Sequence, residues 1–153
     1  MSKPITIDFV SDISCPWCVI GLKGLEQALV RIGEVDAELR FQPFELNPHM
    51  PPEGQRLVDY AAQKYGSTPQ QLGERRAMVR ERAAELGFTI ALPPEEGRVY
   101  NTFDAHRLLH LALATGGTEV QARPNAALET AHSERGEDVG DHAVLRRTAV
   151  AAG

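Results

Sequence analysis

The chain has 153 residues, of which 42% are hydrophobic and 24% charged, a balance that predicts a globular protein with a substantial apolar core. A formal net charge of −5 and an aromatic content of 6% argue against the basic, base-stacking surface of a nucleic-acid-binding protein. We find neither a signal-peptide pattern nor a window near the roughly 20 apolar residues of a membrane span, so we expect a cytoplasmic protein without a membrane partner.

The first predicted elements form a β-α-β unit. Residues 5–10 alternate apolar and polar side chains, which is typical of a short strand. Residues 15–33 then carry apolar side chains at steps of three and four, which predicts an amphipathic helix that ends near Gly33. Residues 39–44 alternate again and predict a second strand, in which Pro43 indicates a sheet edge or the end of the strand.

The middle of the chain changes from strands to helices. The proline-rich residues 47–54 predict a loop. Leu72, Val79 and Leu86 then recur at a spacing of seven, which predicts an amphipathic helix that Gly87 ends. The arginines and glutamates of this helix are expected on its opposite face, which indicates a solvated surface rather than a phosphate site.

The last third of the chain is also predicted to be helical. Residues 101–117 predict a helix that Asn101 or Thr102 caps and that the Gly-Gly pair ends. Because proline removes a backbone donor and clashes within a helix, we expect a loop and a new helix start at Pro124. Asp141 is expected to cap the last helix.

The only two cysteines, Cys15 and Cys18, stand where the first strand leads into the first helix. Their spacing puts both side chains on neighbouring positions of one helix face, so a disulfide between them is feasible. At the helix start Cys15 meets unpaired N–H groups and the positive end of the helix dipole, which favour its thiolate. Cys15 is therefore the candidate attacking residue, and Cys18, further in and more buried, the candidate resolving residue. A C-x-x-C pair at such a junction of a β-α-β unit is a thioredoxin-like redox signature.

The neighbours of the cysteines fit this interpretation. Pro16 suits the first helical position, where its fixed φ is favourable and its missing N–H costs little. Trp17 is expected to face outward and to offer an apolar platform to a substrate. Asp12 would oppose thiolate formation if its side chain points inward.

Two other uses of the cysteines remain open. Zinc usually takes four ligands, so a zinc site would need His106 and His110, which lie four apart on one predicted helix. Such histidines are more often polar residues of a helix face or groove, and we expect no metal. The other alternative is a pair of structural cysteines, which the choice of Pro16 and Trp17 disfavours.

The motif S-D-x-x-C-P-W-C-x-x-G, in residues 11–21, resembles the DsbA-like thioredoxin-fold family. It is most similar to the FrnE-like branch, which is related to 2-hydroxychromene-2-carboxylate isomerases and kappa-class glutathione transferases. The resemblance continues through residues 41–54 and 101–112. It implies an α/β fold, thioredoxin-like with a large helical insertion, in which residues 1–46 form the N-terminal β-α-β part and residues 47–153 the insertion.

The resemblance also implies a function. Cys15 and Cys18 would be the redox cysteines of a thiol–disulfide oxidoreductase that binds no cofactor, uses glutathione as a candidate electron donor and acts on thiols or disulfides of proteins or small molecules. In the isomerase and transferase relatives a serine replaces Cys15 and activates glutathione, so a glutathione-dependent isomerase or transferase is the alternative. By resemblance, Asn101 and His106 line the substrate cleft; otherwise Asn101 is only a helix cap and His106 only a polar flank.

The sequence departs from the family pattern towards its end. The resemblance implies further strands after the last helix and a cis-proline loop against the dithiol, and no proline of this chain matches that loop. We therefore expect the C-terminal strands of the fold to be missing. The alternatives are a truncated or decaying C-terminal half, a fragment of a longer product, and a chain that an oligomer or a partner chain completes. Glu129 and Ser133 stand where the resemblance implies apolar packing residues. A non-catalytic remnant is thus a third alternative.

Overall fold

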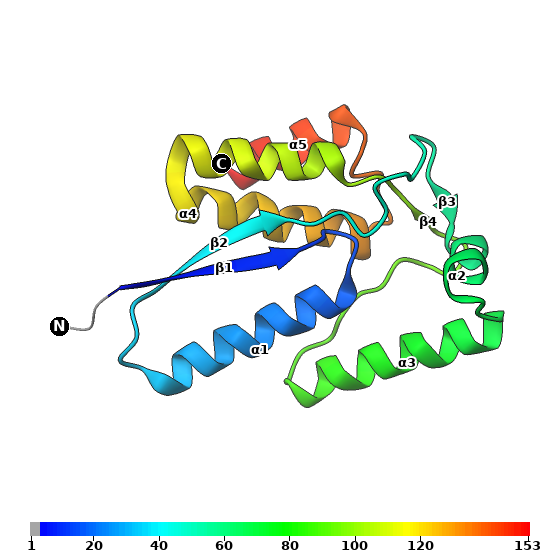
Figure 1. Cartoon of the computed structure of the whole chain (residues 1–153), viewed down its shortest axis with the longest axis horizontal. Helices are drawn as coiled ribbons and strands as arrows, with labels where there is room; N and C mark the ends of the chain where they lie inside the picture. Colours follow the sequence, from blue (N-terminus) through cyan, green and yellow to red (C-terminus); the bar gives the residue numbers. More distant parts are fainter. Residues whose placement is uncertain (1–3) are drawn as a thin grey trace.

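A parallel pair of strands forms the centre of the fold, with helices on both sides. The computed structural model describes residues 4–153. Strands β1 (Ile5–Ser11) and β2 (Ala37–Pro43) pair in parallel and are connected by α1 (Pro16–Ile32). Figure 1 shows α1 on one side of this pair and the helices α4 and α5 on the other. This arrangement confirms the predicted β-α-β unit.

Helix α1 begins and ends where the sequence predicts. Cys15 is its N-cap residue, in an extended conformation, and Pro16 occupies the first helical position. At the other end Gly33 adopts a left-handed φ of 72°, and its N–H donates to the carbonyl of Leu29. A residue without a Cβ adopts this conformation at little cost, which is why the helix ends there. The cysteine motif is therefore held at the N-terminus of a well-defined helix.

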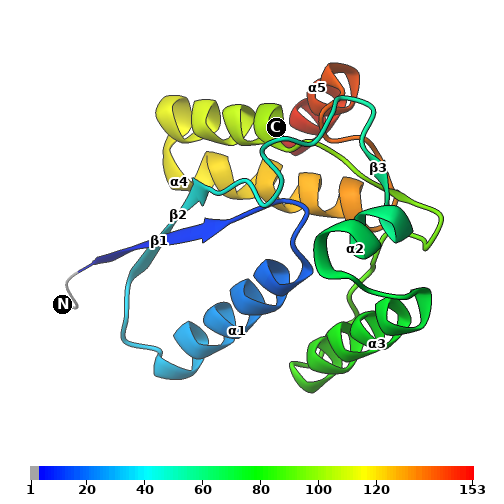
Figure 2. The same ribbon diagram turned by 45° about the vertical axis from the view of Figure 1, so that its right-hand side comes forward.

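The segment between β2 and α4 carries two helices and a very short antiparallel pair of strands. Both views place α2 and α3 beyond the N-terminal end of α1 (Figure 1, Figure 2). The seven-residue pattern lies in α3, which begins with a capping box between Thr68 and Gln71. Gly66, with a φ of 63°, separates the two helices. The elements are β3 (Gln55–Arg56), α2 (Leu57–Tyr65), α3 (Pro69–Glu85) and β4 (Arg98–Val99), with β3 antiparallel to β4.

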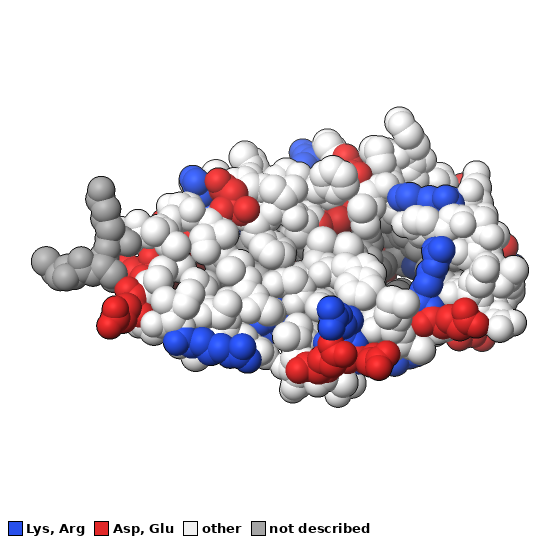
Figure 3. Space-filling model, turned by 60° about the horizontal axis from the view of Figure 1, so that its bottom comes forward, with Lys and Arg blue, Asp and Glu red and all other residues white. Residues whose placement is uncertain are grey.

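Charged side chains of both signs lie scattered along the face formed by α1 and α3, most of which is uncharged (Figure 3). Figure 3 shows acidic and basic residues interspersed there. Short ion pairs such as Lys23–Glu26, at 2.8 Å, contribute to this pattern. The prediction that the arginines of α3 all face solvent is wrong for Arg76, which is buried and donates from Nη2 to the carbonyl of Pro93 at 2.6 Å. The spacing of the apolar residues predicts a narrower buried face than the structure has, because the loop after α3 also covers Arg76.

Helix α4 (Phe103–Ser133) turns back on itself at Gly117, so that it forms two antiparallel halves (Figure 1). Gly117 has a φ of 75° and a ψ of −168°, which confirms the break predicted at the Gly-Gly pair. The predicted loop at Pro124 is wrong: Pro124 is buried within the second half and the helix continues through it. The lost backbone hydrogen bond is outweighed because the proline ring lies on the buried face of this half.

The main core joins the cysteine loop to α4 and α5 (His142–Ala152). A second, smaller cluster packs α3 and the loop after it against α1. Asp141 caps α5 as predicted, since its side chain accepts from the N–H of Ala143 at 2.7 Å. None of the helices within residues 4–153 is both long and apolar enough to cross a membrane. The main core consists of Ile13, Ala105, Leu109, Leu128, Ala131, Val139 and Leu145.

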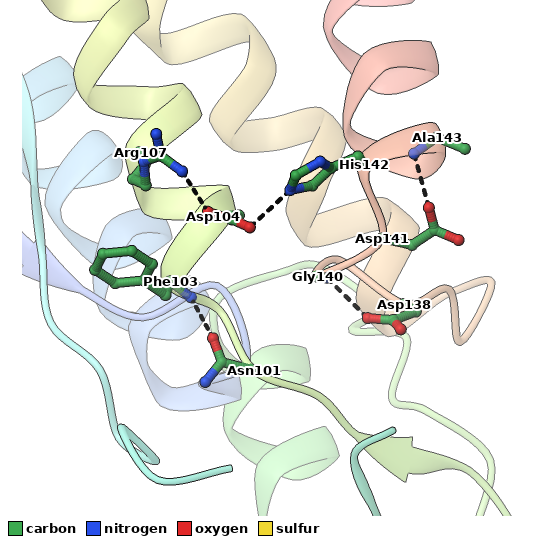
Figure 4. A network of polar contacts seen from close by, with 9 residues as sticks. All are labelled: Asn101, Phe103, Asp104, Arg107, Asp138, Gly140, Asp141, His142 and Ala143. Carbon is green, nitrogen blue, oxygen red and sulfur yellow. Dashed lines mark hydrogen bonds and ion pairs between the residues drawn. The ribbon is translucent and has the colours of Figure 1, made fainter. Parts of the chain in front are cut away.

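Polar contacts tie the start of α4 to the start of α5 (Figure 4). Thr102 holds the N-cap position of α4 without a side-chain bond, while Asn101 accepts from the N–H of Phe103 at 2.9 Å. One turn further, Asp104 contacts His142 of α5 at 2.8 Å. The predicted cap is thus made by Asn101, one residue before the N-cap position.

A buried side chain of α4, Gln121, pairs with the outer edge of β2 at Phe41. Gln121 is fully buried, and its Oε1 accepts from the N–H of Phe41 at 2.9 Å. Its Nε2 donates to the carbonyl of Phe41 at 2.8 Å and to that of Leu109 at 3.2 Å. The side-chain amide therefore satisfies backbone groups that a neighbouring strand would otherwise satisfy.

Glu129 lies in a hollow of about 350 Å³ between α1 and the second half of α4, which Ser133 also lines. Its carboxyl accepts from Nδ2 of Asn125 at 3.1 Å, but burial dominates and raises its pKa from 4.5 to about 7. The folded chain thus binds this proton more tightly than the unfolded chain. The stability that results is fully present below pH 4.5 and is lost as the pH rises through about 7.

We expect Glu129→Gln to stabilise the fold only at the higher pH. Because each pKa unit corresponds to about 1.4 kcal/mol and the side chain is partly exposed, the free energy of unfolding should rise by about 2 kcal/mol at pH 8. At pH 4 the change should be small, since the carboxyl is already protonated there. Urea denaturation at both pH values measures this, with exposed Glu134→Gln as the matched control. An equal effect at the two pH values would contradict the assignment.

Candidate active site

The two cysteines form a hydrogen-bonded pair of free thiols at the start of α1. Both are half-buried, so the expected difference in their depth is not resolved. The backbone holds them in one turn: the N–H of Cys15 donates to the carbonyl of Asp12, and the N–H of Cys18 donates to the carbonyl of Cys15, each at 3.1 Å. The Cys18 thiol lies beside the sulfur of Cys15 without a disulfide and stabilises the thiolate of Cys15. The structure therefore brings the two predicted redox residues together.

This contact shifts the pKa values of the two thiols in opposite directions. The hydrogen bond from Cys18 lowers the pKa of Cys15 from 9.0 to about 6, against burial, and the backbone N–H groups of Cys18 and Trp17 lower it further. The same hydrogen bond, together with burial, raises the pKa of Cys18. At neutral pH Cys15 is thus the thiolate and Cys18 the protonated thiol. A nucleophile next to a proton-holding partner is the arrangement that disulfide exchange requires.

A pocket of about 440 Å³ opens beside Cys15. The cysteine loop forms one wall, α2 and α3 form the others, and the end of α4 reaches it. Pro16 and Trp17 line it, and Trp17 is 47% exposed, as predicted for an apolar platform. Its lining includes Cys15, Trp17, Tyr60, Arg75, Arg76 and His132.

The wall opposite the cysteines combines aromatic rings with cations. Tyr60 and Tyr65 pack edge to face, with ring centroids 5.9 Å apart. The Arg75 guanidinium lies 5.2 Å from the Tyr65 ring centroid, while Lys64 Nζ, 5.4 Å from that of Tyr60, does not belong to the lining of the pocket. Arg76 is buried, and within residues 4–153 its Nε has no hydrogen-bond partner. Such a wall suits an organic molecule that carries a negative charge.

Asp12 points inward beneath the cysteine loop and is almost fully buried. Its Oδ2 accepts from the N–H of Leu46 at 2.7 Å, and its Oδ1 contacts Nε2 of His106 at 3.3 Å. Burial alone would raise the pKa of Asp12, but the hydrogen bonds from His106 and Leu46 outweigh it, so the pKa is lowered. The resulting negative charge opposes the Cys15 thiolate. The hydrogen bond from Cys18 outweighs this effect.

Asn101 and His106, the predicted substrate-binding residues, lie behind the cysteine loop. Asn101 donates from Nδ2 to the carbonyl of Met50 at 3.1 Å, and His106 is buried against Asp12. Neither belongs to the wall of the Cys15 pocket. Their contact with substrate stays a prediction. Across residues 4–153, no group of three or more His, Cys, Asp or Glu side chains is arranged to hold a metal ion.

Sequence reasoning missed the distant residues of the pocket. Tyr60, Arg75 and Arg76 come from the helical region, and His132 comes from the end of α4. No local motif marks these positions. The one signal is Arg76, a charged residue that shares the buried face of α3 with Val79 and Ala83. This signal can be recognised only once the fold is known.

Comparison with solved structures gives two informative matches. One, titled a "probable DsbA oxidoreductase" from Streptomyces coelicolor, is 29% identical with a TM-score of 0.76, and the match covers 97% of this chain and 62% of that one. The other, the cytosolic disulfide reductase DsbM from Pseudomonas aeruginosa with GSH, is 21% identical with a TM-score of 0.54, over 97% of this chain and 65% of that one. This chain thus spans less than two thirds of the length of either protein.

Comparison with curated proteins gave no match. The model of the DSBA-like thioredoxin domain matches residues 6–153, which is nearly the whole chain. The match agrees with the strand–helix–strand unit, the cysteine pair at the helix start and the large helical region. The chain therefore belongs to the family of DSBA-like thioredoxin domains, with a thioredoxin-like fold.

Proposed function

We propose that this chain is a thiol–disulfide oxidoreductase that uses Cys15 as its nucleophile and Cys18 as its resolving thiol. One observation carries the proposal: two free thiols stand together at the N-terminus of α1, where Cys15 is the N-cap residue and opens onto a pocket of about 440 Å³. The family supports the same chemistry at a coarser level, as thiol–disulfide oxidoreduction of the DsbA type.

The chemistry follows from the two pKa values. In the reduced chain the Cys15 thiolate attacks a substrate disulfide, and one substrate sulfur leaves with the electron pair of that bond and takes up a proton. Cys18 then loses its proton and attacks the Cys15 sulfur, so that the second substrate sulfur leaves as a thiolate. Two electrons have passed from the dithiol to the substrate, and the chain holds a Cys15–Cys18 disulfide. Run in reverse, the same steps oxidise a dithiol substrate.

The pocket favours a glutathione-dependent activity as the second candidate function. Arg75 and Arg76 line a pocket with aromatic walls, and glutathione carries two carboxylates beside its thiol. DsbM was solved with GSH, which makes glutathione the donor to test first. In this alternative the chain would act as an isomerase or transferase of the kind related to the FrnE-like branch.

The proposal includes a location and a set of partners. The proposed branch is the FrnE-like one and the proposed location the cytoplasm; DsbM is likewise a cytosolic disulfide reductase. Its substrates are thiols or disulfides of proteins or small molecules. A second copy or a partner chain would complete the sheet beside β1.

Alkylation kinetics test the state of the nucleophile. The rate at which iodoacetamide modifies Cys15 should rise with a midpoint near pH 6, because the hydrogen bond from Cys18 stabilises the thiolate. Mass spectrometry of quenched samples separates Cys15 from Cys18. In Cys18→Ala the hydrogen bond is lost, so the midpoint should move upward. A midpoint near the ordinary 9.0 in the unmodified chain would contradict the proposal.

A further inference from the structure

His132 is a buried histidine that the chemistry described above does not use. It lies at the end of α4, is 3% exposed and lines the same pocket as Cys15. Among the described residues, 4–153, nothing forms a hydrogen bond with its Nδ1. A buried polar atom without a partner costs free energy, so its presence beside a pocket calls for an explanation.

The packing connects His132 to the cysteine loop. Ile13, two residues before Cys15, belongs to the same core cluster as Ala131, the residue before His132. The negative charge of Asp12, on the same loop, acts on the imidazole. A substrate sulfur bound to Cys15 would therefore lie in a pocket that His132 also lines.

The surroundings keep the imidazole uncharged. Burial lowers the pKa of His132, and the charge of Asp12 opposes this effect without cancelling it. The other ionisable groups of the pocket are the Cys15 thiol on the cysteine loop, Tyr60 and Tyr65 on α2, and Arg75 and Arg76 on α3. At neutral pH the ring is therefore free to accept a proton.

We propose that His132 is the proton-exchanging group of the Cys15 pocket and acts as general base on the substrate thiol. In the oxidised chain the imidazole takes the proton of the substrate thiol, and the substrate sulfur then attacks Cys15 Sγ. The Cys15–Cys18 bond breaks, its electron pair goes to Cys18, and Cys18 takes up a proton from the imidazolium or from water. In the reverse direction His132 returns the proton to the leaving substrate thiolate. This role rests on the proposed function.

The test uses thiols that differ in their need for a base. The oxidised chain is mixed with an alkyl thiol, which is mostly protonated at pH 7, or with an aryl thiol, which is already ionised. The fluorescence of Trp17, the only tryptophan, follows the reaction next to Cys15. His132→Asn should slow reduction by the alkyl thiol by on the order of 10²-fold and leave reduction by the aryl thiol unchanged. At a pH above the pKa of the alkyl thiol the deficit should disappear.

Two controls keep the test decisive. His132→Gln should behave like His132→Asn, and exposed His110→Asn, on the same helix but outside the pocket, should react like the unmodified chain. Equal slowing with both thiols, or slowing that persists at high pH, would show a structural role and overturn the proposal. So would unchanged rates in both His132 variants. If the unmodified chain forms no reducible Cys15–Cys18 disulfide, the proposed function itself fails, and this role fails with it.

Discussion

Replacing Cys15 by serine should abolish disulfide exchange by this chain. The loss should be on the order of 10³-fold or more, because a serine hydroxyl is not ionised near neutral pH and cannot replace the thiolate that Cys18 stabilises. The measurement is the reduction of a small disulfide or of a disulfide-containing protein by the chain in the presence of a thiol donor. The substitution changes one atom, so the fold should be retained, and circular dichroism checks this.

Cys18→Ser is the matched variant, because it keeps the nucleophile but removes the resolving thiol. It should attack the substrate once and remain as a mixed disulfide on Cys15, which mass spectrometry detects as a covalent adduct. Exchange that survives Cys15→Ser would contradict the redox mechanism. Turnover of glutathione-dependent isomerisation by Cys15→Ser would favour the alternative function, in which a serine at this position activates glutathione.

Local signals in the sequence were sufficient for the first third of the fold. The alternation of residues 5–10, the apolar steps after Cys15 and the glycine at position 33 each act within one or two turns of the chain, and the structure confirms all three. The same holds for the Asp141 cap and the break at Gly117. These features depend on backbone preferences that neighbouring residues determine.

The features that sequence reasoning missed depend on contacts between distant segments. Pro124 is tolerated because tertiary burial outweighs one lost hydrogen bond, which no local rule predicts. Arg76 is buried because the chain near Pro93 returns over α3. The cysteine pair was predictable since its chemistry comes from one helix end, whereas His132 reaches the same pocket from a helix that begins more than 80 residues later. The candidate redox pair was thus visible in the sequence, and the pocket beside it was not.

The buried contact of Gln121 with β2 should be among the largest contributions of a single side chain to stability. Gln121 bonds both backbone groups of Phe41 across 80 positions of sequence, and Phe41 is itself buried. Gln121→Ala removes these bonds and leaves an N–H and a carbonyl without partners. Since each unsatisfied buried group costs about 1–3 kcal/mol, we expect the free energy of unfolding to fall by about 3–4 kcal/mol. Denaturant titration measures it.

Two further variants separate the hydrogen bonds from the loss of packing. Gln121→Glu keeps the shape and an acceptor for the Phe41 N–H, but its carboxylate faces the Phe41 carbonyl without a proton to donate. Burial should raise the pKa of this carboxyl, so the deficit of this variant should shrink as the pH falls towards about 4, because the protonated carboxyl can donate again. Gln70→Ala, which removes an exposed amide bonded only to Glu74, should change stability by less than about 0.5 kcal/mol. A Gln121→Ala variant as stable as Gln70→Ala would show that the edge of β2 does not depend on this side chain. Among residues 4–153 the sheet beside the cysteine loop has two strands, β1 and β2, so losing that edge should also loosen the platform from which α1 presents Cys15.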